Sequence, residues 1–249
     1  MSTTHSDGRA PGYVGSHTLP YVTELRRQFG RRRTQLAIGF LALLPVILAI
    51  AFTVGSSSET DSDAGGLIEL GTRGGVNFTV FALFMSVGFL LIVVVALFFG
   101  DSVASEASWS SLRYLLAIPV PRTRLLLQKA LVSATLSLAA IGVLVGVSLA
   151  LGTALYGADP LVTPFGDGLA YGDAVARLLI AVGYIAVNLL WVAGLAMLLS
   201  VLTDAPLGAV GGAVMTSILM QILDQITALS EDRERLWKQV SDAEFLSRK

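Results

Sequence analysis

Long apolar segments separated by short polar connections dominate the chain. Five apolar runs are each about 20 residues long or longer, enough for a helix to cross ~30 Å of hydrocarbon. Inside lipid the backbone cannot hydrogen-bond to water, so each run is predicted to be helical. The runs cover 35–54, 78–100, 131–156, 178–202 and 207–226. The pattern therefore predicts an all-α integral membrane protein with five transmembrane helices.

Composition agrees with this class, because 54% of the 249 residues are apolar and only 14% are charged. Soluble domains carry about a quarter charged residues. The chain has no cysteine, which excludes disulfides and thiolate sites. Residues 1–33 lack the apolar run of a cleavable signal, so the first apolar segment is expected to be retained as a span.

The same pattern divides the chain into four parts. Residues 1–20 are predicted to be a disordered arm, and 21–33 a helix at the membrane interface. Residues 34–229 form the predicted transmembrane domain, which includes a polar connection at 101–128. The charged tail at 230–249 cannot span a bilayer and is expected to form a short amphipathic helix at most.

Orientation follows from the alternation of basic and acidic connections. The loop at 55–77 is acidic, with Arg73 as its single basic residue, and the loop at 157–173 has no Lys or Arg. By contrast, the segment before the first span and the connection at 101–128 are basic. Basic connections stay inside. The N-terminus and 101–128 are therefore predicted to be cytoplasmic in a cell-membrane protein.

Residues 21–33 have the pattern of an amphipathic helix on the inner membrane surface. Val22, Leu25 and Phe29 share one helical face. Arginines surround that face and are expected to anchor it at anionic headgroups. A plain positive-inside anchor with no further role is the alternative, and the two interpretations do not exclude each other. The predicted membrane-surface anchor consists of Arg26, Arg27, Arg31, Arg32 and Arg33.

Motifs for catalysis within the chain are lacking. There is no G-x-x-x-x-G-K-[ST] phosphate loop, and His5 and His17 both lie in the polar arm. No metal-ligand pair occurs at helical spacing, so no metal and no catalytic residue is predicted, and nothing indicates nucleic-acid binding. Arg177 and Asp224 lie near the ends of their spans, where snorkelling accounts for them. Without a buried carboxylate, a secondary transporter is disfavoured.

Two G-x-x-x-G pairs predict close helix packing, since glycine lets helix backbones approach each other in a membrane. Gly142 and Gly146 lie in the third span, and Gly208 and Gly212 in the fifth.

The connection between the second and third spans is unusually stiff. A helix is predicted over 102–118, with Trp109, Leu112 and Leu116 on one face and with Glu106 and Arg113 one seven-residue repeat apart. Pro119 and Pro121 end it in a rigid turn that leads into the third span. A solvated connector needs no such rigidity, so the segment is interpreted as a surface on which a partner pushes.

These residues resemble a family, the ABC-2 type permeases, which are the membrane subunits of ATP-driven exporters. The resemblance rests on Glu106, the Ser-Ser-Leu-Arg stretch at 110–113, the Leu pair at 115–116, the Pro-Val-Pro-Arg turn at 119–122 and Lys129. The basic helix before the first span also resembles the family's connecting helix. Family members normally have six spans, whereas five are found here.

The resemblance implies a coupling helix in this connection that docks on a separate ABC ATPase subunit. The residues expected at that interface are Glu106, Trp109, Leu112, Arg113, Pro119 and Arg122. It also implies that ATP and Mg bind to the partner ATPase, that two permease chains work together, and that an amphipathic drug-like or lipid-like substrate is exported. The alternative is a non-transporting membrane scaffold or regulatory subunit that holds a cytoplasmic partner through the same helix.

Overall fold

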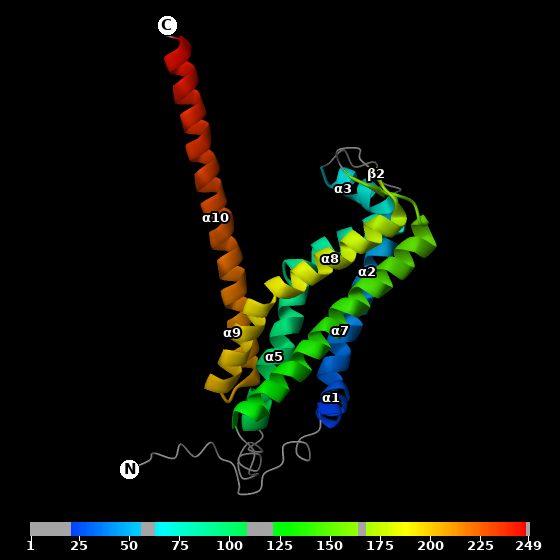
Figure 1. Cartoon of the computed structure of the whole chain (residues 1–249), viewed down its shortest axis with the longest axis vertical. Coiled ribbons are helices and arrows are strands. Elements are labelled where there is room, and N and C mark those ends of the chain that lie inside the picture. The colour runs from blue at the N-terminus through cyan, green and yellow to red at the C-terminus, as the bar shows by residue number, and fades with distance from the viewer. Residues whose placement is uncertain (1–20, 56–62, 109–121, 164–167, 248–249) are drawn as a thin grey trace, which may run out of the picture.

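A computed structural model describes residues 21–55, 63–108, 122–163 and 168–247, with the backbone alone at 55, 63–65, 67, 122 and 227–247. The described part is almost entirely helical (Figure 1). Its elements are α1 (Tyr21–Phe29), α2 (Arg32–Gly55), α3 (Asp63–Thr72), α4 (Gly75–Val87), α5 (Leu90–Ser108), α7 (Arg122–Tyr156), β1 (Leu161–Val162), β2 (Gly168–Leu169), α8 (Tyr171–Asn188), α9 (Leu190–Leu202) and α10 (Pro206–Ser247).

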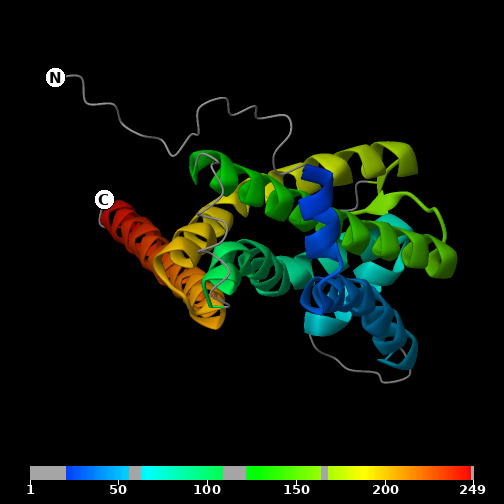
Figure 2. The same cartoon turned by 90° about the horizontal axis from the view of Figure 1, so that it is seen from below.

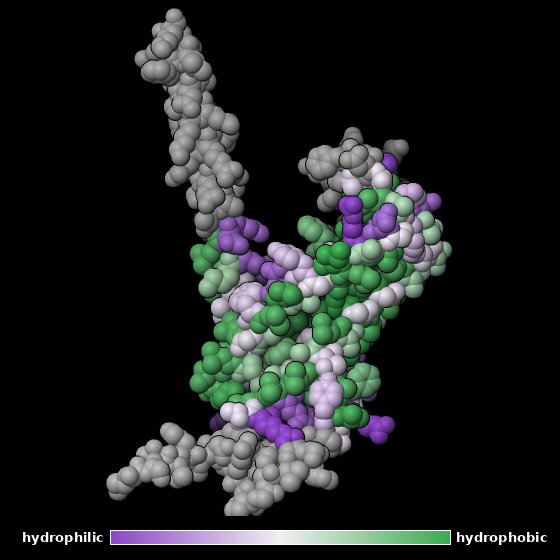
Figure 3. Space-filling view, in the orientation of Figure 1, coloured by the Kyte–Doolittle hydropathy of each residue, from purple (hydrophilic) through white to green (hydrophobic). Residues whose placement is uncertain are grey.

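Within the described residues, five helical segments are long and apolar enough to cross a membrane, which confirms the predicted class and number of spans. Figure 3 shows the corresponding belt of apolar surface between two more polar ends. We call these the α1 end, where α1 and the turn between α9 and α10 lie, and the hairpin end, where α3 and the β1–β2 hairpin lie. The described parts of the two basic connections, 21–33, 101–108 and 122–128, lie at the α1 end.

The second and fourth spans differ from the sequence expectation because each is interrupted. The predicted run at 78–100 is divided into α4 and α5 at Gly88 and Phe89, and α5 continues as helix to Ser108. Gln221 Nε2 in α10 donates a hydrogen bond to the Gly88 carbonyl, 3.1 Å away. The fourth run is divided into α8 and α9 at Leu189. Both runs are predominantly apolar, so their composition does not indicate where the helices are interrupted.

Both ends of the chain's helical part also differ from expectation. The predicted interfacial helix at 21–33 ends at Phe29, where Gly30 N–H bonds to the Arg26 carbonyl at 3.0 Å, and the next helix starts at Arg32. The predicted tail at 230–249 does not begin a new element. Its backbone continues the fifth span without interruption, so that α10 runs for 42 residues to Ser247.

Helix α5 is the centre of the bundle. It packs against α7, α9 and α10 and is mostly buried, whereas the other spans expose one apolar face. Gly100 permits part of this packing, because a Cβ there would lie 2.9 Å from Val210 Cγ2 of α10. Two helices also approach each other closely at the hairpin end. A Cβ on Gly75 of α4 would lie 2.5 Å from Thr153 Cγ2 and 2.7 Å from Thr153 N of α7.

Of the four glycines in the predicted G-x-x-x-G pairs, Gly212 alone makes a tight helix-to-helix contact in the described part of the chain. Gly142 and Gly146 are exposed, and a Cβ at either would meet nothing within 4 Å. A Cβ on Gly208 would meet Ala205 Cβ at 3.6 Å, a contact close to it in sequence, while one on Gly212 would lie 3.1 Å from Leu199 Cδ1 of α9. The tightest crossings described here are permitted by Gly75, Gly100 and Gly152, which lie outside the two predicted pairs.

At the hairpin end, α7 stops at Gly157, whose φ of +82° favours glycine. The chain then forms the antiparallel pair of β1 and β2. Asn77 of α4 holds this pair through both sides of its amide. Its Nδ2 donates to the Val162 carbonyl at 2.8 Å, and its Oδ1 accepts from Val162 N–H at 3.1 Å. Edge-to-face contact of Phe52 with Phe78 links α2 to α4 nearby.

Candidate functional site

A partly buried cluster of charged side chains joins four helices, α1, α2, α5 and α7, at the α1 end. Helix α1 crosses α7 beside the start of α2, as the view from below shows (Figure 2). The Tyr21 hydroxyl is hydrogen-bonded to Thr135 Oγ1 on α7. The charged residues of α1 and of the following turn then face the last two turns of α5. We call this cluster the charged junction; it comprises Glu24, Arg27, Arg31, Arg33, Asp101, Ser105, Glu106 and Lys129.

Glu106 is the centre of the first half of the charged junction. Its Oε1 lies 2.7 Å from Lys129 Nζ of α7 and 2.6 Å from Arg27 Nη2 of α1. The side chains of Glu106 and Lys129 are only 4% and 5% exposed. Lys129 also donates to the Ser102 carbonyl at 3.1 Å and lies 3.7 Å from Glu24 Oε1. One carboxylate therefore connects α5 to both α7 and α1.

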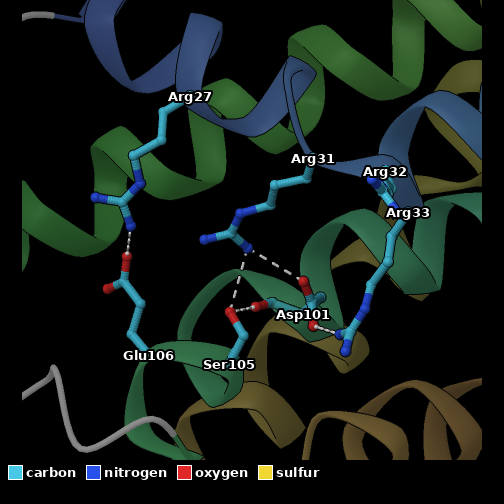
Figure 4. A pocket seen from close by; sticks show the side chains of 7 residues that line it. All are labelled: Arg27, Arg31, Arg32, Arg33, Asp101, Ser105 and Glu106. Carbon is cyan, nitrogen blue, oxygen red and sulfur yellow. Dashed lines mark hydrogen bonds and ion pairs between the residues drawn. The ribbon is translucent and has the colours of Figure 1, made fainter.

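Asp101 forms the second half, one turn and a residue earlier on α5. Arg31 Nη1 lies 3.2 Å from Asp101 Oδ2, and Arg33 Nη1 lies 2.8 Å from Asp101 Oδ1 (Figure 4). Arg31 also donates to Ser105 Oγ at 3.2 Å, and Ser105 in turn donates to the Asp101 carbonyl at 2.6 Å. The turn between α1 and α2 and the first turn of α2 are therefore fixed to α5, because one arginine from each binds the same carboxylate.

Helical spacing explains why these side chains meet. Asp101 and Ser105 are four residues apart and so lie on the same face of α5, with Glu106 beside them. Because α5 stays helical to Ser108, this polar stretch extends the apolar span rather than leaving it as a loop. On the other side, the break after Phe29 turns the arginines at 31 and 33 toward α5.

Hydroxyl groups attach the same part of α5 to its other neighbours. Ser200 Oγ of α9 accepts from the backbone N–H groups of Val103 and Ala104, at 3.1 and 3.0 Å. Ser133 Oγ of α7 donates to the Phe98 carbonyl at 2.8 Å. Such bonds are more stable than in water, since the surroundings offer no competing solvent. The end of α5 is thus bonded to four other helices, including α1 and α2.

The charged junction is suited to hold helices together and not to carry out a reaction. Among the described residues no three His, Cys, Asp or Glu side chains gather in a way that could hold a metal ion. The carboxylates are matched by cations, as buried charges require. The charged junction lies directly before the end of α5 at Ser108, and α7 starts at Arg122. The connection at 109–121 is therefore attached at both ends to helices that the junction ties together.

The residues proposed for the ATPase interface are placed as follows. Glu106 is buried in the charged junction, whereas a direct contact with an ATPase subunit would require it to be exposed. Trp109, Leu112, Arg113 and Pro119 lie outside the described residues, as does the side chain of Arg122. Their role stays a prediction.

The five arginines of the predicted membrane-surface anchor divide into two groups. Arg27, Arg31 and Arg33 are engaged in ion pairs within the chain. Arg26 and Arg32 are exposed, and the described contacts give neither a carboxylate partner. The first group therefore attaches α1 and the start of α2 to α5.

Sequence reasoning missed Asp101 and Glu24 as site residues, and Lys129 was singled out only through the resemblance. The sequence did contain a usable signal. Asp101, Ser105 and Glu106 follow an apolar run, and no proline separates them from it. That pattern continues the helix, which gives the polar residues a common face.

Comparison with known proteins decides the family. The family described as "ABC-2 family transporter protein" has a sequence model that matches residues 27–239, which is well over half of the chain. The chain belongs to the ABC-2 transporter family. No curated protein and no solved structure matched the chain.

Membership confirms the resemblance on which the sequence analysis relied. An ABC-2 membrane component is not itself the ATPase of its transporter, and the family implies an ABC ATPase as partner. All residues of the charged junction except Glu24 lie within the matched region. In this ABC-2 protein, the site of interest is therefore the place where α1, α5 and α7 are joined beside the connection at 109–121.

Proposed function

We propose that this ABC-2 protein is the permease subunit of an exporter in the cell membrane, with its N-terminus cytoplasmic. Separate ATPase subunits bind ATP and Mg, and two permease chains form the pathway. The observation that carries this proposal, beyond family membership, is the charged junction beside both ends of 109–121.

The proposed mechanism is transfer of motion through connected helices. ATP binding draws the two ATPase subunits together and displaces the 109–121 connection, with Trp109, Leu112, Arg113, Pro119 and Arg122 as the contact residues. Because Glu106 binds Lys129 of α7 and Arg27 of α1, α5 moves together with both helices. Ser200 extends the connection to α9. The pair of chains then changes between inward- and outward-facing states. In this role Glu106 positions helices and does not touch the ATPase.

The proposed substrate is an amphipathic drug-like or lipid-like molecule. Its support is the apolar lining of two cavities. One, of about 180 Å³, lies where α5 and α7 meet the break between α8 and α9, and includes Phe99, Ile141 and Leu189. The other, of about 300 Å³, lies between α3, α4 and β1 at the hairpin end and includes Phe81 and Phe84. Such cavities favour apolar groups over ions.

The test is reconstitution with an ATPase. The chain is co-expressed with a Walker-motif ATPase subunit, purified as a complex and placed in lipid vesicles, and ATP turnover is measured. Glu106→Gln keeps the shape of the side chain but removes its charge, and is expected to lower the ATP turnover of the complex at least about tenfold, the loss that one charge-assisted bond represents. Glu69→Gln is the matched control, since Glu69 pairs with Arg73 on the exposed surface at the hairpin end.

The outcomes are distinct. Failure of any ATPase to co-purify with intact, membrane-inserted chain would overturn the permease proposal. A complex that assembles, but whose turnover is unaffected by Glu106→Gln, would contradict the transfer of motion through the charged junction. The measurement includes the amount of each subunit bound, so that lost assembly is not mistaken for lost coupling.

A further inference from the structure

Beside the charged junction lies a cavity of about 550 Å³ at the α1 end. Four arginines and two carboxylates line it, together with one serine (Figure 4). The lining residues are Arg27, Arg31, Arg32, Arg33, Asp101, Ser105 and Glu106. Most of these residues form the ion pairs of the charged junction, whereas Arg32 lines the cavity outside those pairs.

The charges of the cavity lining are not balanced. Four arginines against two carboxylates leave two positive charges in excess. Arg27 is paired with Glu106, while Arg31 and Arg33 share the single carboxylate of Asp101. Arg32 has no carboxylate partner among the described contacts. Adjacent cations repel each other, and an anion in the cavity would relieve that repulsion. Guanidinium groups bind phosphate oxygens in a planar, two-pronged manner.

The surface next to Arg32 is apolar. Arg32 begins α2, and the residues at 36, 40, 43 and 47 follow it on the same helical face. Their exposed fractions are 73% for Leu36, 58% for Phe40, 46% for Leu43 and 52% for Ile47. A basic residue at the head of an exposed apolar stripe matches an amphiphile, whose charged group and hydrocarbon chain are joined in one molecule.

We propose that this cavity binds the phosphate-bearing headgroup of an anionic phospholipid, with an acyl chain lying along Leu36, Phe40 and Leu43. Arg32 and the free edges of the guanidinium groups of Arg31 and Arg33 hold the phosphate. The bound lipid joins the start of α2 to the charged junction. This inference does not depend on the transport proposal, because it concerns binding to the permease chain alone.

The experiment compares two arginines of equal charge. The full chain is purified in detergent, short-chain phosphatidylglycerol is titrated in, and bound lipid is counted by native mass spectrometry. Arg32→Gln is expected to weaken phosphatidylglycerol binding about tenfold, the value of one charge-assisted hydrogen bond of ~1.5 kcal/mol. Arg26→Gln removes the same charge from α1, outside the cavity lining, and is expected to change the binding constant less than about twofold, as surface charges do.

Further arms separate the lipid from other anions. Phosphatidylcholine of the same chain length is expected to bind at least about tenfold more weakly than phosphatidylglycerol, because its headgroup carries no net charge. Phe40→Ala is expected to weaken phosphatidylglycerol binding and to leave any effect of inorganic phosphate on the thermal midpoint unchanged. Arg32 and Phe40 are both exposed, so these variants should keep the fold, which circular dichroism checks.

Two results would overturn the proposal. Equal losses from Arg26→Gln and Arg32→Gln would assign lipid binding to diffuse surface charge rather than to the cavity. A thermal midpoint raised as strongly by inorganic phosphate as by phosphatidylglycerol, with no loss in Phe40→Ala, would make the site one for a free anion.

Discussion

At the α1 end, Glu106 and Lys129 approach to 2.7 Å between α5 and α7, whereas at the hairpin end Gly75 and Gly152 bring α4 and α7 together. The first contact is between opposite charges on side chains, one of them long and flexible. The second is between backbones, and it leaves no room for a Cβ. The same helix, α7, contributes to both.

This difference in contact type indicates how each end tolerates movement. Coulomb attraction falls off slowly with distance, and the side chains can reorient to keep their partners. Close-packed surfaces lose much of their attraction when they separate by less than 1 Å. The α1 end is therefore suited to small displacements of its helices, while the hairpin end is suited to hold α4 and α7 in a fixed relation.

The largest expected effect is at the α1 end. Lys129→Met removes a buried positive charge and keeps a side chain of similar shape. Glu106 is then left with Arg27 as its ion-pair partner, and about half of the Arg27 side chain is exposed. The free energy of unfolding should fall by about 3–5 kcal/mol, as when one member of a buried ion pair is removed. Reversible unfolding by dodecyl sulfate in detergent micelles measures it. Arg73→Gln, which breaks an exposed pair, should cost less than ~1 kcal/mol.

A double variant shows whether charge is responsible. Lys129→Met combined with Glu106→Leu removes both buried charges, and should recover most of the lost stability because no uncompensated ion remains. If the double variant is less stable than Lys129→Met alone, packing rather than charge holds α5 and α7 together at this end.

The next effect is at the hairpin end. Gly75→Ala places a Cβ 2.5 Å from Thr153 Cγ2 and 2.7 Å from the backbone of α7, so α4 must move away. Overpacking of this kind should cost about 1–3 kcal/mol in the same unfolding measurement. Gly142→Ala is the matched change on α7, where the new Cβ meets nothing within 4 Å. It should be neutral or stabilising by up to ~1 kcal/mol. A loss at Gly142 equal to that at Gly75 would place a second helix on the exposed face of the G-x-x-x-G pair.

The smallest effect concerns the β1–β2 pair. Asn77→Asp keeps the oxygen that accepts from Val162 N–H but loses the donor to the Val162 carbonyl, while Asn77→Ala loses both. Each lost bond should cost about 1 kcal/mol. Amide exchange at Val162 should accelerate in Asn77→Ala more than in Asn77→Asp. Equal protection in both variants would show that Asn77 does not hold the hairpin.

The spans were predictable from the sequence because their length and apolar composition are local properties. The breaks were not. Gly88 ends α4 with its carbonyl bonded to Gln221, a residue 133 positions away, and no local pattern encodes that contact. Likewise, Asp101 was assigned to a connection because it is charged. Its environment is instead set by Arg31 and Arg33, whose position depends on the turn after Phe29.

The unbroken course of α10 has a practical consequence. A straight helix of 42 residues is ~63 Å long, about twice the thickness of a bilayer's hydrocarbon core. Figure 1 shows it extending well past the other helices at the hairpin end. A rod that projects ~30 Å from its point of support shifts its tip by ~0.5 Å for each degree of tilt. A spin label or fluorophore near Ser247 would therefore magnify tilts of the fifth span that are too small to detect within the bundle.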